Sequence, residues 1–353
     1  MAGNPKTQFL TNDALTRKKW ARDLFPLILS SLELKDLLGT SEDSIIQQRT
    51  ELAKGEGDVI KIGLVLPLVG AGVVGNNPVE GNEEKLIFKD FSVTIEELNH
   101  AVDTGGRMEE QRVPYDLMQI GKTGLQRWWG EKLNLSAWAH ICGDTSFKIA
   151  GSTFAQAPTN PDTGHWLRVN DAATDAAMTS ADVMDLTFLD RMKQKAEIPA
   201  SGCYKIRPLG IGGKSYYRVF LHTYCFDQLR TNMNVGQWGD LQRAAGKLAV
   251  PNVEFEYNGM LVSKSENVCK SPTNGSVYRN VLLGCQAAVF AFGGAGESKS
   301  TTMAFVPYEK DAKRFVMIRG GGIFGVKKTF FSLEGADRDY GIITGSSWGA
   351  ALS

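Results

Sequence analysis

A glycine-rich turn at the end of an apolar run constrains this chain more than any other feature. Gly70 and Gly75 bound the motif Gly-Ala-Gly-Val-Val-Gly, which follows an apolar run at residues 60–69. In dinucleotide-binding proteins such a turn opens a helix, whose N-terminal N–H groups bind the pyrophosphate. Here Pro78 follows the turn, lacks an N–H and disfavours a helical conformation at Asn77. The motif therefore predicts the tip of an extended β-hairpin, and a soluble nucleotide-binding enzyme using residues 70–75 is the alternative.

The first arm of this hairpin carries more apolar surface than a free ribbon can bury. Beyond the apolar residues of 60–65, it holds Leu66, Leu68, Val73 and Val74. Burying each such side chain is worth about 1.5–3 kcal/mol, whereas a two-stranded ribbon alone buries little. The run is also too short to span a bilayer. The arm must therefore pack on the rest of its own chain or on another copy.

The second arm, residues 86–95, alternates apolar and polar side chains, which is typical of a half-buried strand. Glu83 and Glu84 precede it, and Arg107 and Arg112 follow its end. An acidic pair near a turn suits a solvated loop. The four charged residues are also candidates for polar contacts that set the register between neighbouring copies.

Two helical segments flank the hairpin. Residues 1–55 read as an arm, in which the leucines of 27–38 have helical spacing. This apolar stripe docks either on its own core or on a neighbouring subunit, and the pattern leaves both open. After Gly105 and Gly106, residues 113–141 are the best helix candidate, and Trp128 on it is expected to serve both core and interface.

The rest of the chain mixes short strands and helices. Asn-Gly at 258–259 predicts a hairpin within 253–262. Further elements are expected as strands at 204–208, 216–223, 314–318 and 326–333, a helix ending near Pro199, and a buried apolar element at 281–292. An arm, a hairpin, a long helix and then mixed short elements indicate an α+β fold.

Composition limits the class of protein. The chain has 353 residues with 39 basic and 39 acidic side chains. It therefore lacks the net positive charge that is typical of a protein whose main function is to bind nucleic acid. A near-neutral wall could still hold packed DNA without sticking to it. Five widely spaced cysteines predict reduced thiols, and neither a signal peptide nor a membrane span is expected.

Motifs that suggest chemistry are incomplete. Residues 345–349 match G-x-S-x-G, but no downstream acid and histidine follow. Residues 320–325 match G-x-G-x-x-G and lead into a strand-like segment. None of the four histidines, His100, His140, His165 and His222, pairs with another at metal-ligand spacing. We therefore expect no catalytic residue, metal or cofactor.

Several blocks of the sequence resemble the major capsid proteins of N-four-like tailed phages. The most specific are Gly-Asn-Glu-Glu at 81–84 and Gln-Arg-Val-Pro at 111–114, and weaker blocks extend the likeness over nearly the whole chain. Asn99 departs from the pattern, in which a basic residue is expected before His-Ala-Val. That departure puts one inter-subunit ion pair in doubt.

The resemblance implies the Hong Kong ninety-seven fold of tailed-phage capsids. By similarity we expect an N-terminal arm at 1–55, an extended loop at 56–106 and a peripheral domain at 107–200 with a spine helix at 112–141. An axial domain at 201–290 and a return to the peripheral domain at 291–353 complete the expected layout.

The implied function is a structural one, the self-assembly of an icosahedral head around double-stranded DNA. The expected partners are copies of the chain in hexamers and pentamers, with scaffold, portal and decoration proteins possible and the DNA bound non-specifically. Assembly is expected in the host cytoplasm, and the final location is the virion. No covalent crosslink between subunits is expected. Besides the nucleotide-binding enzyme, a monomeric binding module is the remaining alternative.

Overall fold

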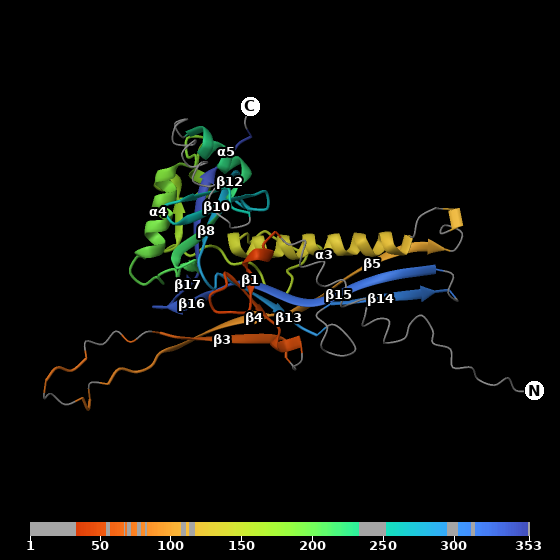
Figure 1. The fold of residues 1–353 in the computed structure, drawn as a ribbon, viewed down its shortest axis with the longest axis horizontal. Coiled ribbons are helices and arrows are strands. Elements are labelled where there is room, and N and C mark those ends of the chain that lie inside the picture. The colour runs from red at the N-terminus through yellow and green to blue at the C-terminus, as the bar shows by residue number, and fades with distance from the viewer. Residues whose placement is uncertain are drawn as a thin grey trace, which may run out of the picture.

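The computed structural model describes residues 33–53, 57–66, 68, 72–75, 79–81, 83–106, 111–112, 117–232, 252–294, 303–311 and 315–351. Two large sheets organise this part of the chain, one within an elongated body and one within a blockier body (Figure 1). A two-stranded hairpin projects from the base of the elongated body, on the side opposite the end at which the long helix begins (Figure 1).

The elongated sheet has six strands. They are β1 (Leu38–Gly39), β2 (Ile46–Arg49), β5 (Glu96–Gly106), β13 (Ala288–Phe292), β14 (Met303–Lys310) and β15 (Phe315–Lys328). Strand β15 is the organising element, because it pairs antiparallel with β14, with β13 through its C-terminal end, and with β5 through the rest. Short 3-10 turns at η1 (Lys35–Leu37) and η2 (Glu51–Ala53) flank β1 and β2.

The long helix α3 (Leu117–Cys142) packs along β15 and β5. Its buried face includes Leu125, Trp129 and Leu133, which are spaced one turn apart and have no solvent exposure. Gly143 ends the helix with φ +69°, a conformation that favours glycine. The helix predicted at 113–141 is thus present over 117–142, and residues 113–116 lie outside the described part.

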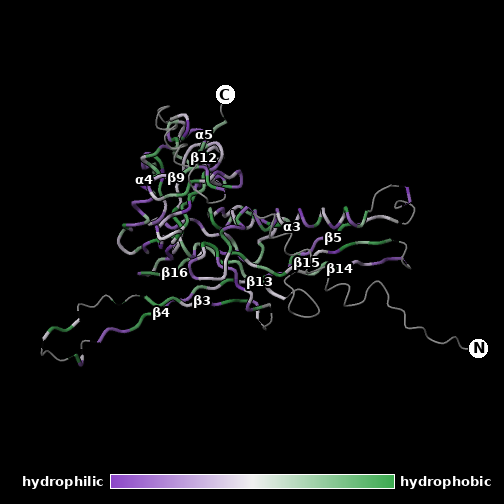
Figure 2. The backbone as a smooth tube through the Cα atoms, in the orientation of Figure 1, coloured by the Kyte–Doolittle hydropathy of each residue, from purple (hydrophilic) through white to green (hydrophobic). Residues whose placement is uncertain are grey.

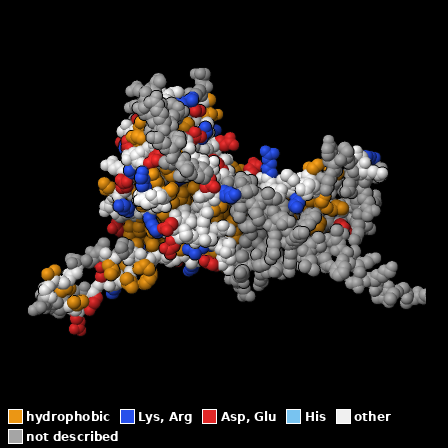
Figure 3. Space-filling view, viewed as in Figure 1, with side chains coloured by type: hydrophobic (Ala, Val, Ile, Leu, Met, Phe, Trp, Pro, Cys, Tyr) orange, Lys and Arg blue, Asp and Glu red, His pale blue; other side chains and the backbone are white. Residues whose placement is uncertain are grey.

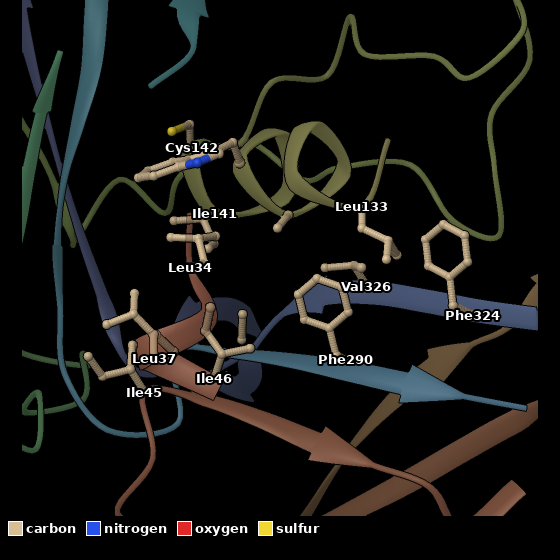
Figure 4. Packing of buried hydrophobic residues seen from close by; sticks show 14 of the residues in the cluster. Leu34, Leu37, Ile45, Ile46, Leu133, Ile141, Cys142, Phe290, Phe324 and Val326 are labelled. Carbon is tan, nitrogen blue, oxygen red and sulfur yellow. The ribbon is translucent and has the colours of Figure 1, made fainter. Parts of the chain in front are cut away.

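The core of the elongated body joins this helix to the first described residues of the chain. Leu34 and Leu37 pack in the same cluster as Leu133, Ile141 and Phe290 (Figure 4). The end of the predicted leucine-rich segment therefore docks on its own chain. It forms a single 3-10 turn and then β1 instead of a helix, and residues 27–32 lie outside the described part.

The second sheet has eight strands and builds the blockier body. They are β6 (Trp166–Arg168), β7 (Leu209–Ile211), β8 (Lys214–His222), β9 (Phe255–Tyr257), β10 (Met260–Ser265), β11 (Lys270–Ser271), β12 (Asn274–Leu283) and β18 (Ile342–Trp348). Helix α4 (Leu186–Glu197) packs on β18, and α5 (Thr223–Asn232) packs on β8 and β10. Short 3-10 turns, η3 (Val169–Asp171) and η4 (Asp175–Ala177), follow β6. This sheet takes β6 and β18 from outside residues 201–290, because strands distant in sequence pair within it.

The hairpin consists of β3 (Val59–Val65) and β4 (Phe88–Thr94), which pair antiparallel from Val59 opposite Thr94 to Val65 opposite Phe88. Residues 96–106, expected within the same extended loop, form β5 and pair with β15. A small antiparallel pair, β16 (Phe330–Leu333) and β17 (Ala336–Asp339), lies against β4.

Some predicted strands differ from the structure. The Asn-Gly hairpin is confirmed, with Tyr257 opposite Met260 and positive φ at both turn residues. Residues 204–208 are irregular, and the strand begins at Leu209. The apolar element at 281–292 is two strands in different sheets, separated by a turn in which Gln286 has φ 58°. The strands expected at 314–318 and 326–333 are instead the continuous β15 followed by β16.

Candidate assembly surfaces

The base of the hairpin is anchored in a small core of its own. Ile60, Phe91 and Val93 are buried there against Phe331 and the strand β13. The ammonium group of Lys327 lies 4.9 Å from the ring centroid of Phe91 and donates a 2.7 Å hydrogen bond to the carbonyl of Ser92. Burial lowers the pKa of Lys327. These contacts hold the hairpin rigidly at the point where it leaves the body.

Gly325 lets the hairpin approach the sheet. A Cβ atom at this position would lie 1.9 Å from the carbonyl oxygen of Thr94, a distance that no side chain permits. The residues 320–325 that match a nucleotide motif therefore lie within β15 and serve close backbone packing.

Beyond its base, the hairpin leaves large apolar side chains in solvent. The exposed residues are Val65, Leu68, Val74, Val79, Leu86, Ile87 and Phe88. Figures 2 and 3 show hydrophobic stretches and hydrophobic side chains along this limb, well away from the two large sheets. Phe88 is 66% exposed although Phe91, three residues along the same strand, is 3% exposed. Contiguous exposed apolar surface of this kind marks an interaction site.

The predicted contact residues of the hairpin lie on this limb. Leu68 and Val74 are exposed, at 60% and 82%, whereas Leu66 and Val73 are half-buried. Glu83 and Glu84 are exposed, and the Glu83 carboxylate accepts a 2.8 Å hydrogen bond from the Gly81 N–H. Sequence reasoning missed Val79 and Ile87. Both are apolar residues in the segment between β3 and β4, and that feature of the sequence could have identified them as contact candidates.

The other predicted contact residues lie elsewhere. Arg112 is exposed and precedes the first residue of α3, Leu117, by five positions, and Arg107 falls outside the described residues. Trp128 is half-buried on α3, where its ring stacks on His100 at 4.4 Å between centroids and meets Trp129 edge-on. The hairpin and the N-terminal half of α3 extend in opposite directions (Figure 1). The structure therefore separates the acidic pair from Arg112 within one chain.

Asn99 forms its contact inside the chain. Its side-chain oxygen accepts hydrogen bonds from Arg319 Nε at 3.0 Å and from Nη2 at 2.7 Å, and the same guanidinium pairs with Glu97 at 2.7 Å. The neighbouring Gly321 makes room, since a Cβ atom there would lie 2.3 Å from Asn99 Oδ1. The residue that departs from the family pattern thus ties β5 to β15.

The remaining motifs do not form the sites that they suggest. Residues 72–75 contain neither helix nor strand. Ser347 of the G-x-S-x-G match is fully buried in β18. His222 is a satisfied core residue, stacked on Tyr278 at 3.7 Å, and its burial lowers its pKa to about 4. No helix in the described part of the chain is long and apolar enough to cross a membrane.

One cluster of potential metal ligands escaped the sequence analysis. Asp162, His165 and Cys203 bring their ligand atoms within 4.8 Å of one another. Burial raises the pKa of Asp162, but hydrogen bonds from His165, Gly164 and Arg338 outweigh it and lower that pKa to about 2. Burial, followed by the charge of Asp162, raises the pKa of the Cys203 thiol. Spacing does not reveal the cluster, because Cys203 is distant in sequence from Asp162 and His165.

Comparisons with known proteins agree with this architecture. A family model described as phage capsid protein matches residues 8–350. The major capsid protein of Pseudomonas phage KPP25 is 31% identical over 242 residues, which covers 63% of this chain and 62% of that protein. The chain thus aligns with somewhat less than two thirds of that relative's length.

Solved structures show the same fold. The capsid of Ralstonia phage GP4 matches with a TM-score of 0.78 at 25% identity over 90% of both chains. The capsid asymmetric unit of Cyanophage Pam1 matches with a TM-score of 0.69 at 18% identity over 100% of this chain and 96% of that one. The predicted α+β capsid fold of the Hong Kong ninety-seven type is confirmed, and the narrower kinship with N-four-like phages stays a prediction. Because the family model spans nearly the whole sequence, the chain belongs to the phage capsid protein family.

Proposed function

We propose that this protein builds the shell of a phage head by associating with copies of itself. The proposal rests on the hairpin, whose base is buried and whose outer part is exposed to solvent. The side chains of Leu68, Leu86 and Phe88 are each at least 59% exposed on that outer part. A second copy that covers them recovers the free energy that a lone chain leaves in water.

Polar contacts would then set the register. Glu83 and Glu84 lie on the hairpin, and Arg112 lies five positions before the first residue of α3. Attraction between such ends steers one copy onto the next and suits many repeated contacts. We include Arg107, Leu66, Val73, Val74 and Trp128 in the proposed contact surface.

The proposed layout follows the capsid fold. Residues 201–290 form the axial domain at the centre of hexamers and pentamers, with β6 and β18 completing its sheet. The arm at 1–55, the loop at 56–106 and the rest of the segments 107–200 and 291–353, without β6 and β18, form the periphery. The shell encloses double-stranded DNA without specific contacts, assembles in the host cytoplasm, and can recruit scaffold, portal and decoration proteins.

The test is to overexpress the full chain and examine it by sedimentation velocity and negative-stain electron microscopy. Closed shells or capsomers are the expected result. A single monomer peak at high protein concentration would contradict the proposal and favour a monomeric binding module.

A charge-exchange cycle tests the register contacts. Glu83→Lys and Arg112→Glu should each weaken assembly, and the double variant should recover part of the loss. The coupling is expected at roughly 0.2–1 kcal/mol per contact, the range of exposed ion pairs, and should shrink in high salt. Strictly additive effects of the two substitutions would remove this pair from the proposed contacts.

A further inference from the structure

A cluster of a buried acid, a buried histidine and a half-buried thiol lies at the junction of three segments. Asp162 and His165 precede β6, and Cys203 follows α4. The side chains of His165 and Asp162 are 0% and 5% exposed. Arg338 of β17 donates a 2.6 Å hydrogen bond to Asp162 Oδ1, which leaves Oδ2 directed at the histidine.

The hydrogen bonds of His165 determine what its Nδ1 atom can do. Its Nε2 lies 2.9 Å from the carbonyl oxygen of Tyr204, and a carbonyl oxygen only accepts, so Nε2 carries a hydrogen. Its Nδ1 lies 2.9 Å from the Asp162 carboxylate, which is also an acceptor. Two acceptors cannot face each other without a positive centre between them. That centre is either a proton or a metal ion.

The position of Cys203 separates these two possibilities. A proton between His165 and Asp162 needs no third partner, yet the Cys203 sulfur belongs to the same convergent group. A Cβ atom on Gly164 would lie 2.1 Å from that sulfur and 3.0 Å from Asp162 Oδ2. The Cys203 sulfur therefore lies directly over Gly164 and beside Asp162 Oδ2, and only a glycine lets it approach so closely.

We propose that Asp162, His165 and Cys203 bind a divalent transition-metal ion, with Zn²⁺ as the best match. Zn²⁺ accepts nitrogen, oxygen and thiolate ligands together, whereas Ca²⁺ and Mg²⁺ require oxygen ligands. A histidine that ligates through one nitrogen characteristically donates its other N–H to a carbonyl, as His165 does to Tyr204. Arg338 holds the second carboxylate oxygen of Asp162, and water completes the coordination.

The ion would join segments that lie far apart in sequence. The Asp162 N–H donates to Asp339, which pairs with the buried Lys328 at the end of β15. Tyr204, next to Cys203, packs edge-on against Phe331 of β16. A metal at this point ties the loop before β6 and the loop after α4 to the β16–β17 pair, and so stabilises the junction of the two bodies.

The experiment uses the full-length chain purified in the presence of Zn²⁺ and then desalted. Elemental analysis should find stoichiometric zinc, and a chelator should lower the melting temperature. Exchange with Co²⁺ should give a thiolate-to-metal charge-transfer band, which only a cysteine ligand produces. Cys203→Ser should abolish the band and weaken zinc binding by more than the roughly 10–100-fold that follows loss of a partner of a metal ligand.

The matched control is Cys225→Ser, because Cys225 is fully buried on α5, away from the proposed ligands, and its sulfur already accepts a hydrogen bond from the Ser347 hydroxyl. This variant should keep the cobalt band and the response to the chelator. Zinc-free protein with an unchanged melting temperature, or a Cys203→Ser variant that binds zinc as tightly as the parent, would overturn the proposal. If the Cys203 variant does not fold, a missing cobalt band in the parent protein overturns it equally. None of these results bears on shell assembly.

Discussion

Two phenylalanines on one strand should separate assembly from folding. Phe88 and Phe91 both lie on β4, but Phe88 is 66% exposed and Phe91 is 3% exposed. Fully burying a phenylalanine side chain is worth about 1.5–3 kcal/mol. Covering the exposed two thirds of the Phe88 side chain is therefore worth about 1–2 kcal/mol per subunit contact. Phe91→Ala removes a side chain from a closed core and should cost about 3–5 kcal/mol of folding free energy.

The expected results therefore differ in kind. Phe88→Ala should leave the unfolding free energy of the unassembled protein within about 0.5 kcal/mol of the parent. Its assembly threshold should rise by a factor of about 5–30, the equivalent of 1–2 kcal/mol. Phe91→Ala should lower the midpoint of urea unfolding of the unassembled chain, because the hairpin base loses its packing.

Urea denaturation of the unassembled chain and light scattering across protein concentration measure the two quantities separately. The reasoning is refuted if Phe88→Ala destabilises the single chain as much as Phe91→Ala does. It is equally refuted if Phe88→Ala leaves the assembly threshold unchanged, since the exposed hairpin would then contribute nothing to contacts between copies.

Three further predictions concern the body of the subunit. Gly325→Ala places a Cβ atom 1.9 Å from the Thr94 carbonyl, so it should displace the hairpin base and cost about 1–3 kcal/mol in urea unfolding; an unchanged midpoint would contradict the proposed close approach. His140, whose burial and neighbouring lysines lower its pKa to about 3, stays neutral when folded but binds a proton below about pH 6.5 when unfolded. Stability should therefore fall as pH drops from about 6.5 towards 3, and a His140→Asn variant should show a shallower pH dependence of its melting temperature. Lys328→Met leaves Asp339 buried without its 2.8 Å partner and should cost about 3–5 kcal/mol, whereas the double variant with Asp339→Leu should recover much of this loss; a neutral single variant would rule the pair out as a structural contact.

Local patterns predicted much of the fold. The alternation of 86–95 and the apolar run from residue 60 predicted a hairpin, and β3 and β4 form it. The Asn-Gly turn predicted at 258–259 is present because both residues adopt positive φ at low cost. The long helix predicted at 113–141 is present as α3 over 117–142. Each of these signals lies within a few residues of the element that it predicts.

The features that the sequence analysis missed, the continuity of β15 and the cluster of Asp162, His165 and Cys203, depend on long-range contacts. The glycine run at 320–325 read as a break between two strands, yet it lies inside β15. Its glycines make room for partners such as Asn99 and Thr94, which come from distant segments. The metal-ligand cluster was invisible for the same reason, because Cys203 meets His165 only after the α4 loop folds back.

The sequence by itself determined that an apolar hairpin must be covered by something, since the free energy of that many buried aliphatic side chains depends on composition and spacing alone. Tertiary structure decided which of them remain uncovered. Packing on β13 and β16 shelters Phe91, whereas Phe88, on the opposite face of β4, stays in solvent. Alternation along the strand sets which side chains share a face, but which face is covered depends on where distant strands lie.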